Sequence, residues 1–566
     1  MDGAGLAVYA KLTLDLLECR MDNKPVEEAD APVKGGEQEA IDREISRRRT
    51  FAIISHPDAG KTTLTEKLLL YSGMIRTAGM VRGRKGGKGV TSDWMTMEKE
   101  RGISITASAM QFTYRNTVMN VLDTPGHQDF SEDTYRTLMA ADCAAMVIDA
   151  AKGVEAQTRK LFAVCRLRKI PVITFVNKMD LHGREPLDLL AEIEEVLGIH
   201  ASALNWPVGM GRDFAGVIDR RTSELLAFSK TSIAGALKAD TDRIPVSRLA
   251  EEGIINPEEL AHLTHDLELL EHAGNPFSRE ALLRGEVTPV LFGSALTNFG
   301  VEPFFDAFVE LAPPPGPRSA DGPGGREVIL DPAKSPFSAF VFKLQANMDR
   351  RHRDTLAFLR ICSGRFDRDM MVRHHRLGKE VRLSRAQTMV ARERNQLEVA
   401  YPGDIVGVIS SGQFSIGDTL SSQGGFDFRP LPAFPPEVFA EVRPTDVGKR
   451  KTFDKGVEQL TREGTIQMLR RRDNPNGRPI VAAVGRLQLD VLEHRLRDEY
   501  GVACVIENMP HMCSSWVRGD VGTLQGLNEV LVTLDWMDRP MLLFTSEWAR
   551  NYVEQKNPGH KFSRFG

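Results

Sequence analysis

A loop near residue 60 carries residue types that bind phosphate groups. It reads Ser-His-Pro-Asp-Ala-Gly-Lys-Thr, which matches Gly-x-x-x-x-Gly-Lys-[Ser/Thr] except that Ser55 replaces the first glycine. Gly60 would let the backbone approach the phosphates, Lys61 can reach the β- and γ-phosphates, and the Thr62 hydroxyl can bind Mg²⁺. A helix start without a ligand is the alternative reading. The pattern predicts a nucleotide-binding loop formed by Ser55, His56, Pro57, Asp58, Ala59, Gly60, Lys61, Thr62 and Thr63.

A second motif, Asp123-Thr124-Pro125-Gly126-His127, follows a short apolar run. Asp123 is placed to hold Mg²⁺ through water, and Gly126 leaves room for its amide to meet the γ-phosphate. His127 then stands where hydrolysis requires a side chain that orients water. An isolated histidine is more often structural than catalytic, but this position directly after Asp-x-Pro-Gly favours catalysis. We therefore include all five residues in the predicted site.

The tetrapeptide Asn177-Lys178-Met179-Asp180 indicates which base is bound. The Asp180 carboxylate can accept two hydrogen bonds from the N1 and N2 donors of guanine, and adenine lacks this donor pair. Lys178 can lie along the base, and Asn177 can tie neighbouring loops together. The motif is short enough to occur by chance, but it ends a predicted strand and follows both phosphate motifs. It therefore predicts GTP and GDP, rather than ATP, as the ligands.

Two further segments complete the predicted site. Gly293-Ser294-Ala295 ends an apolar run, and the Ala295 amide would face guanine O6. The stretch Arg-Gly-Ile-Ser-Ile-Thr offers two hydroxyls, Ser104 and Thr106, either of which could be a second ligand of Mg²⁺. Their spacing does not choose between them, and a plain polar loop is the alternative. Ordering of such a loop around a γ-phosphate converts nucleotide hydrolysis into a change of shape.

These motifs require strands that end at one edge of a sheet. Apolar runs predict strands at residues 51–55, 118–122, 145–149 and 172–176, and helical patterns predict helices at 61–71, 155–167 and 184–197. Strands that alternate with helices indicate parallel βαβ units and an α/β sheet. The chain between Asp180 and Gly293 is longer than such a domain needs, so we expect an inserted subdomain near residues 205–285.

The remaining chain divides where its pattern changes. We expect a mobile N-terminal extension at 1–46, a P-loop GTPase domain at 47–315 and a Pro- and Gly-rich linker at 316–336. Short β-like runs predict a small barrel or sandwich at 337–430. Mixed patterns, with helices near 454–463 and 487–499, predict a C-terminal α/β domain at 431–566. The predicted fold class is therefore multidomain α/β.

Composition excludes several other classes of protein. The six cysteines form no Cys-x-x-Cys pair, which argues against a disulfide framework or a zinc site and is typical of a reducing compartment. No apolar run reaches the roughly 18 residues that a membrane-spanning helix needs. The net charge is only −4, but residues 349–394 hold 13 Lys/Arg against 6 Asp/Glu. This local excess favours an RNA-facing surface on the predicted barrel, with a solvated basic face as the alternative.

The strings SHPDAGKT, RGISIT, DTPGH, NKMD and GSA, taken in this order, resemble those of the translational GTPases. Within that group the chain is most similar to the bacterial class II peptide-chain release factors. The similarity runs from residue 47 to the C-terminus and rests on strings such as TSDWMTMEKERGISIT, VFKLQANMD and AVGRLQLDVLEHRLRDEYGV. A serine at position 55 is also typical of the family.

The resemblance implies an elongation-factor-type β-barrel and a third α/β domain after the GTPase domain. It implies two partners: the ribosome, with its RNA and proteins, and the class I release factors. It also implies a monomer that does not bind membranes. Members of the family help to recycle class I release factors after peptide release, and GTP hydrolysis lets them leave the ribosome. The family favours the cytoplasm, with the plastid stroma as the alternative.

The resemblance also implies roles for individual residues. The hydroxyl directly after Arg-Gly-Ile is a metal ligand in the family, which favours Ser104 over Thr106. The residue that matches His127 positions water once the RNA of the large ribosomal subunit engages it. Pro57 and Ile103 would flank that histidine as an apolar gate, with simple loop packing as the alternative.

Three other functions stay open. They are a translocase-like translational GTPase, a GTPase subunit of a metabolic enzyme, and a scaffold that binds nucleotide without hydrolysing it. The chain after residue 430 is too short for the further domains of a translocase, and the basic barrel argues against the metabolic subunit.

Overall fold

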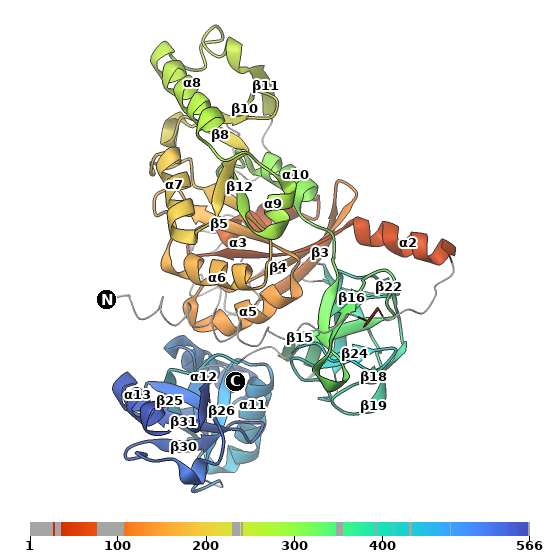
Figure 1. Cartoon of the computed structure of the whole chain (residues 1–566), viewed down its shortest axis with the longest axis vertical. Coiled ribbons are helices and arrows are strands. Elements are labelled where there is room, and N and C mark those ends of the chain that lie inside the picture. The colour runs from red at the N-terminus through yellow and green to blue at the C-terminus, as the bar shows by residue number, and fades with distance from the viewer. Residues whose placement is uncertain are drawn as a thin grey trace.

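The computed structural model describes residues 27–28, 35–75, 107–228, 238, 241–346, 355–390, 393–410, 412–429, 433–475 and 477–563 (Figure 1). Three residues singled out in the sequence, Ile103, Ser104 and Thr106, lie outside the described residues. Most of the predicted extension at 1–46 lies outside them as well.

A seven-stranded sheet carries the predicted nucleotide motifs. Its order is β3-β4-β2-β5-β6-β12-β7, and neighbouring strands are parallel except for β3 and β4. The predicted α/β sheet is therefore confirmed, and the antiparallel edge strand is an element that the sequence did not indicate. The strands are β2 (Arg48–Ser55), β3 (Ser108–Tyr114), β4 (Thr117–Asp123), β5 (Cys143–Asp149), β6 (Val172–Asn177), β7 (His200–Ala203) and β12 (Val287–Phe292).

Helices cover both faces of this sheet, and β2 divides its side chains between them. Phe51 and Ile53 face a core shared with α3 and α10, whereas Ala52 and Ile54 face a core shared with α5, α6 and α7. Because both faces are covered, the central strands are continuous apolar runs rather than alternating patterns. The helices are α3 (Lys61–Tyr71), α5 (Ser131–Ala140), α6 (Ala156–Leu167), α7 (Pro186–Leu197), α9 (Arg279–Arg284) and α10 (Val301–Leu311). We call this sheet and its helices the sheet unit.

The segment expected to hold an inserted subdomain forms a separate four-stranded sheet at the top of Figure 1. Asn205, at its start, donates from Nδ2 to the carbonyl of Phe292 (3.1 Å) and accepts from the Phe292 amide (2.7 Å). This pair of hydrogen bonds joins the insert to the sheet unit at β12. Its elements are β8 (Asn205–Val208), β9 (Gly216–Asp219), β10 (Glu224–Phe228), β11 (Thr241–Pro245) and α8 (Pro257–His272).

The predicted linker at 316–336 contains regular structure. β13 (Arg318–Asp321) and β14 (Glu327–Leu330) form an antiparallel pair, and β1 (Glu27–Glu28) adds to β14 in parallel. The glycines and proline between β13 and β14 make their turn, with the Gly322 amide donating to the carbonyl of Arg326 (2.7 Å). The composition that predicted a linker therefore belongs to a hairpin.

Part of the predicted extension is also ordered. Residues Gly35–Ser46 form helix α2, in which Ile41 and Ile45 lie one turn apart and are buried against Ala333 and Tyr401. This spacing places both isoleucines on one face of the helix, so α2 has an apolar stripe to bury. The sequence analysis did not predict this helix.

The predicted barrel is an eight-stranded sheet of order β19-β18-β24-β15-β16-β23-β20-β21. It encloses its own apolar core, in which Phe337, Val341, Leu359 and Val406 are buried. We call it the barrel unit. Its strands are β15 (Ser338–Ala346), β16 (Thr355–Ser363), β18 (Met371–His374), β19 (Lys379–Arg382), β20 (Gln387–Val390), β21 (Glu393–Gln396), β23 (Ile405–Ser410) and β24 (Thr419–Ser421), with the small pair β17 (Phe366–Asp367) and β22 (Val399–Ala400).

A second eight-stranded sheet forms the C-terminal unit, with order β28-β25-β27-β26-β30-β31-β29-β32. Helices α11 (Arg450–Arg462) and α12 (Arg486–Tyr500), both expected from the sequence, share one core with its first strands. Helix α13 (Glu547–Lys556) packs on another part of the sheet. The strands are β25 (Val438–Pro444), β26 (Gln467–Arg471), β27 (Ile480–Ala483), β28 (Cys504–Asn508), β29 (Cys513–Arg518), β30 (Leu531–Leu534), β31 (Pro540–Phe544) and β32 (Lys561–Ser563).

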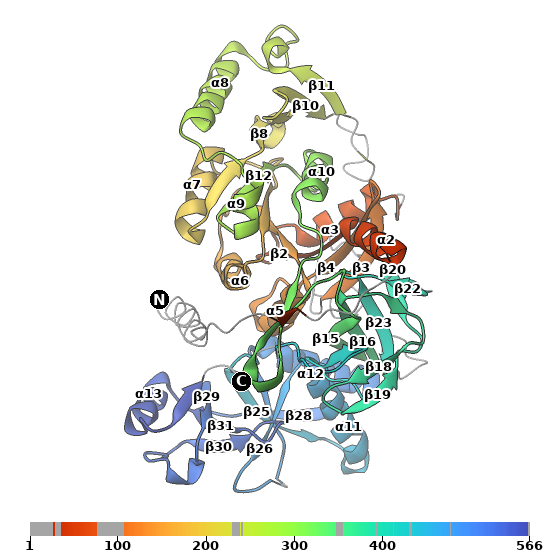
Figure 2. The same cartoon turned by 45° about the vertical axis from the view of Figure 1, so that its right-hand side comes forward.

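Figures 1 and 2 both place α5 at the junction of the sheet unit, the barrel unit and the C-terminal unit. Within the described ranges, no helix combines the length and the apolar character that crossing a membrane requires.

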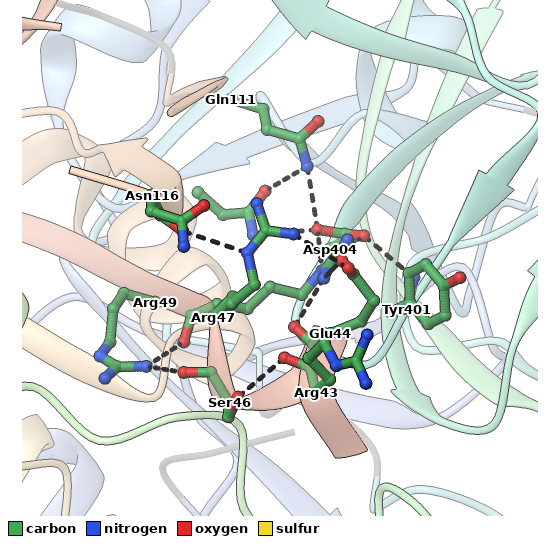
Figure 3. Close-up of polar contacts among 11 residues, drawn as sticks. Arg43, Glu44, Ser46, Arg47, Arg49, Gln111, Asn116, Tyr401 and Asp404 are labelled. Carbon is green, nitrogen blue, oxygen red and sulfur yellow. Dashed lines mark hydrogen bonds and ion pairs between the residues drawn. The ribbon is translucent and has the colours of Figure 1, made fainter. Parts of the chain in front are cut away.

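A buried carboxylate joins the sheet unit to the barrel unit (Figure 3). Asp404 precedes β23 and accepts hydrogen bonds from Arg48 Nε (3.0 Å), Gln111 Nε2 (2.9 Å) and Asn120 Nδ2 (3.2 Å). Arg48 opens β2 and also pairs with Glu44 of α2 at 2.6 Å. The side chains of Arg48 and Asp404 are only 7% and 3% exposed, so each needs the other as a partner.

Asp404→Ala should lower the free energy of unfolding by about 3 kcal/mol, because the buried Arg48 and Asn120 and the half-buried Gln111 lose their shared acceptor. The measurement is urea unfolding followed by tryptophan fluorescence and circular dichroism. Asp454→Ala is the matched control, since Asp454 pairs with Arg450 on the exposed face of α11 and should change stability by less than about 1 kcal/mol. Equal effects of the two variants would contradict the assigned importance of the buried pair.

Candidate functional site

The predicted site residues gather at the carboxyl edge of the seven-stranded sheet. Ser55, Asp123 and Asn177 are the last residues of β2, β4 and β6, and Gly293 directly follows β12. Because these strands are parallel and close together in the sheet order, their ends meet at one edge. This edge is where open α/β sheets bind ligands.

The phosphate loop has a backbone conformation that requires glycine at position 60. Gly60 has φ +98° and lies at the N-cap position of α3, where no side chain caps the helix. The first amides of a helix have no partner within it, and here they point towards the loop. A Cβ at position 60 would lie 2.2 Å from Asn177 Nδ2. Asp58 also has a positive φ, of 66°. Such strain at a helix N-terminus is typical of a site that holds an anion against backbone amides.

Lys61 and Asp123, predicted to bind phosphate and Mg²⁺, lie against each other. Lys61 Nζ is 2.5 Å from Asp123 Oδ1, and the two side chains are 6% and 2% exposed. Thr62, beside Lys61, is half-buried at the start of α3. The Asp123 carboxylate and the Thr62 hydroxyl are oxygen ligands of the kind that Mg²⁺ prefers. The Lys61 ammonium can pair with a phosphate, so these residues fit a nucleotide with its Mg²⁺.

Asn177 holds two loops together. Its Nδ2 donates to the carbonyl of Ala59 (2.8 Å), and its Oδ1 accepts from the amide of Ala295 (2.8 Å). The Met179 amide adds a hydrogen bond to the carbonyl of Gly293 (3.1 Å). One buried side chain therefore connects the phosphate loop to the loop that the sequence assigned to the base.

The residues predicted to read the base lie side by side. Ser294 Oγ donates to Asp180 Oδ1 (2.6 Å), and Lys178, whose φ is +72°, places Nζ 2.7 Å from Asp149 Oδ2. Burial alone would raise the pKa of Asp149, but hydrogen bonds from Lys178 and from backbone amides hold that pKa below its ordinary value. Asp149 therefore stays ionised and orients Lys178.

Two of the residues that orient the site were not identified from the sequence. Asp149 ends β5, and its position at the same sheet edge as Asn177 was the signal that could have found it. Glu155, at the start of α6, lies 3.2 Å from Nε2 of His56 in the phosphate loop. No local sequence pattern marks this second contact.

His127 follows β4 and is about one-third exposed (35%). Its Nδ1 accepts from the amide of Asp129 at 3.3 Å. Gly126, before it, lies beside Pro57, because a Cβ at 126 would be 3.5 Å from the Cα of Pro57. The phosphate loop and the histidine loop are thus in contact.

The chain that leaves the predicted Mg²⁺-binding loop is held by another unit. Asp133, in the first turn of α5, accepts from the amide of Ala107 (2.8 Å), three residues after Ser104. Lys343 of β15 donates from Nζ to the carbonyl of Ala107 and lies 3.5 Å from Asp133. The sheet unit and the barrel unit therefore share this anchor.

The expected basic surface of the barrel is only partly a surface. Arg360 is buried, donates to the carbonyl of Gly403 and pairs with Asp142 of the sheet unit at 2.6 Å. Arg376 lies exposed, but its charge is paired with Asp418 at 2.6 Å. The described basic side chains that do lie exposed are Arg365, Arg368, Arg373, Arg376, Lys379, Arg382 and Arg385.

Three family models match consecutive parts of the chain. Residues 46–314 match the elongation factor Tu GTP binding domain, residues 336–423 match elongation factor G domain 2, and residues 428–554 match the class II release factor RF3 C-terminal domain.

Similar proteins span nearly the whole chain. Peptide chain release factor 3 of Symbiobacterium thermophilum is 51% identical over 91% of this chain and 97% of that protein. Peptide chain release factor 3 of Gloeobacter violaceus is 50% identical over 92% of this chain and 97% of that protein. A solved structure from Thermus thermophilus shares the fold, with a TM-score of 0.65, 22% identity and coverage of 87% of this chain and 73% of that chain.

Asn177→Ala should weaken the binding of GDP and GTP by roughly tenfold to a hundredfold, because the carbonyl of Ala59 and the amide of Ala295 each lose a buried partner. Titration with fluorescent nucleotide measures the dissociation constants. The matched control is Asn557→Ala, which removes another buried asparagine that joins two segments, by bonds to Gln525 and Val553. The control should lose stability and keep its nucleotide affinity. Unchanged nucleotide affinity in the Asn177 variant would refute the role of Asn177 in joining the two loops.

Proposed function

The chain belongs to the peptide chain release factor 3 family, GTP-hydrolysing proteins of translation termination, and we propose that it promotes dissociation of class I release factors from the ribosome after peptide release. Its reaction is the hydrolysis of GTP to GDP and phosphate, and we propose that the ribosome stimulates it. The observation that carries this proposal is the match of residues 428–554 to the class II release factor C-terminal domain. Neither a translocase-like GTPase nor a metabolic GTPase subunit accounts for that match.

We assign the binding of GTP to the loops that meet at the carboxyl edge of the sheet. In this assignment the amides after Gly60 cradle the phosphates, Lys61 pairs with the β- and γ-phosphates, and Asp180 accepts from guanine. The contact between Lys61 and Asp123 supports it, because each residue would turn to its phosphate or metal ligand as the nucleotide binds. The Ser294 hydroxyl on Asp180 presents that carboxylate to the base.

We propose Thr62, Ser104 and Asp123 as the residues that hold Mg²⁺, directly or through water. When bound, Mg²⁺ neutralises charge on the β- and γ-phosphates. His127 orients the attacking water and is the proposed catalytic residue. Its place beside the phosphate loop supports this role.

The partners and the compartment are also proposed. The ribosome would be contacted through exposed basic side chains of the barrel unit, such as Arg373 and Arg382, with the class I release factors as the second partner. We propose a monomer that acts in the cytoplasm or, in a photosynthetic eukaryote, in the plastid stroma. The relatives support both compartments, because the proteins called peptide chain release factor 3 come from bacteria, including cyanobacteria.

Bacterial ribosomes should raise the rate of GTP hydrolysis by the purified protein, because the proposed active site is completed on the ribosome. On ribosomes stalled after peptide release, GTP should also accelerate the loss of a labelled class I release factor. With a non-hydrolysable analogue of GTP the protein itself should stay bound to the ribosome, because hydrolysis is expected to let it leave. No stimulation by ribosomes would refute the ribosomal role, and stimulation without faster loss of the release factor would refute recycling.

His127→Ala should lower ribosome-stimulated hydrolysis by about 10²–10³-fold, the range seen when one positioned group that stabilises a transition state is removed. The affinity for GDP should stay within about twofold of wild type, because His127 lies on the γ-phosphate side of the site. The control is His262→Ala, an exposed histidine on α8, which should leave the rate unchanged. An active His127 variant would favour the scaffold hypothesis instead.

A further inference from the structure

The short turn after His127 reaches the C-terminal unit. This turn, η2 (Gln128–Phe130), precedes α5 and contains Asp129, which is only 9% exposed. Oδ2 of Asp129 accepts from the amide of Leu487 at 2.7 Å, although the two residues are 358 positions apart in the chain. A residue two positions after the proposed catalytic histidine is therefore bound to another unit of the protein.

The partner of Asp129 is the first turn of α12. The residue before this helix, at the N-cap position, is Gly485, which has no side chain with which to cap it. The amides of a first helical turn need acceptors, and carboxylates are favoured there because of the partial positive charge of the helix end. Asp129 thus caps α12 from the sheet unit.

Gly485 makes this close approach possible. Its φ of −148° and ψ of 165° are extended backbone that any residue adopts, so conformation does not require glycine here. Space does, because a Cβ would lie 2.0 Å from Cγ and 2.2–2.4 Å from both carboxylate oxygens of Asp129. The C-terminal unit therefore leaves room at this position for a side chain of the sheet unit.

Asp129 also touches His127. Its amide donates to His127 Nδ1 at 3.3 Å, and its Oδ1 lies 3.4 Å from the same nitrogen. The ring is held through Nδ1 by the residue whose carboxylate binds α12. A displacement of α12 would therefore move the support of the imidazole.

The following helix, α5, meets the C-terminal unit at further points. Gln467 of β26 donates to Glu132 (3.4 Å), and the ring of Tyr135 meets Phe434 edge-on, with centroids 5.5 Å apart. Gly464 lies against the guanidinium of Arg136, which a Cβ there would overlap. The contact of Asp129 with Leu487 is thus part of a docked surface rather than an isolated hydrogen bond.

We propose that Asp129 is a positioning residue through which the C-terminal unit controls the orientation of His127. When the first turn of α12 is docked on Asp129, the imidazole is held through Nδ1, and Nε2 is left to face the attacking water. When the C-terminal unit shifts relative to the sheet unit, this support is lost and hydrolysis slows. The inference rests on the proposed function, because it concerns the ribosome-stimulated reaction.

The test is a double-mutant cycle on the full-length protein. Asp129→Ala removes the cap, and Gly485→Ala inserts a methyl group where the carboxylate lies. Each should lower kcat of ribosome-stimulated GTP hydrolysis about tenfold, within the hundredfold that a misplacement of about 1 Å can cost. The KM for ribosomes and the affinity for GDP should stay unchanged. Because both substitutions break one contact, the double variant should be no slower than the slower single variant.

Two controls separate this role from general damage. Asp520→Ala removes an aspartate that caps a short turn within the C-terminal unit, and Gly559→Ala adds a Cβ with nothing within 4 Å. Both should keep wild-type kcat. Asp129→Asn, which keeps the shape and loses the charge, should give an intermediate kcat and extends the test if an alanine variant fails to fold.

Two results would overturn the proposal. One is a raised KM for ribosomes with unchanged kcat, which would make the contact part of the ribosome-binding surface only. The other is multiplication of the two single effects in the double variant. A wild-type protein whose GTP hydrolysis ribosomes do not stimulate would refute the proposed function instead. The wild-type protein is therefore measured with and without ribosomes before any variant is compared.

Discussion

Buried carboxylates of one unit that are neutralised by arginines of the other hold the sheet unit and the barrel unit in one arrangement. Asp404 of the barrel unit is bound by Arg48 of β2, and Asp142 of the sheet unit is bound by Arg318 (2.8 Å) and Arg360 (2.6 Å). Removing a carboxylate from water is expensive, and an ionised group left unpaired after a shift would lose its compensation. The sheet unit and the barrel unit therefore keep one relative position as long as these pairs are formed. This constraint fixes where β2, and with it the phosphate loop, lies relative to the barrel unit.

The proposed nucleotide site divides into a part that the sheet unit builds alone and a part to which other units contribute. Asn177 and the two loops that it joins lie within the sheet unit, so among the described residues the proposed recognition of base and phosphate is built by that unit. The hydrolytic side differs, because Lys343 of the barrel unit holds the chain at Ala107 and Leu487 of the C-terminal unit binds Asp129. Binding of nucleotide can therefore be local while hydrolysis reports the placement of all three units. Such a division suits a switch whose partner acts on the barrel unit and the C-terminal unit.

The sequence predicted those parts of the structure whose causes are local. Apolar runs located the strands that end at Ser55 and Asn177, and α3 was predicted with its observed bounds. Composition misled where one pattern serves two structures, as in the proline- and glycine-rich stretch that forms the β13–β14 hairpin. The charge count of the barrel was right in number, but it could not show that Arg360 faces Asp142. Contacts between residues hundreds of positions apart have no local pattern from which they could be read.

Gly485 shows how such a distant contact can still leave a trace in the sequence. Serine, threonine, aspartate and asparagine are favoured at the start of a helix because their side chains satisfy its first amides. One of them at position 485 would cap α12 within its own unit and would occupy the space of the Asp129 carboxylate. Glycine leaves the Leu487 amide to water or to the sheet unit. The first turn of α12 is therefore completed by the turn that supports His127, and the stability of that helix end depends on the same docking that orients the histidine.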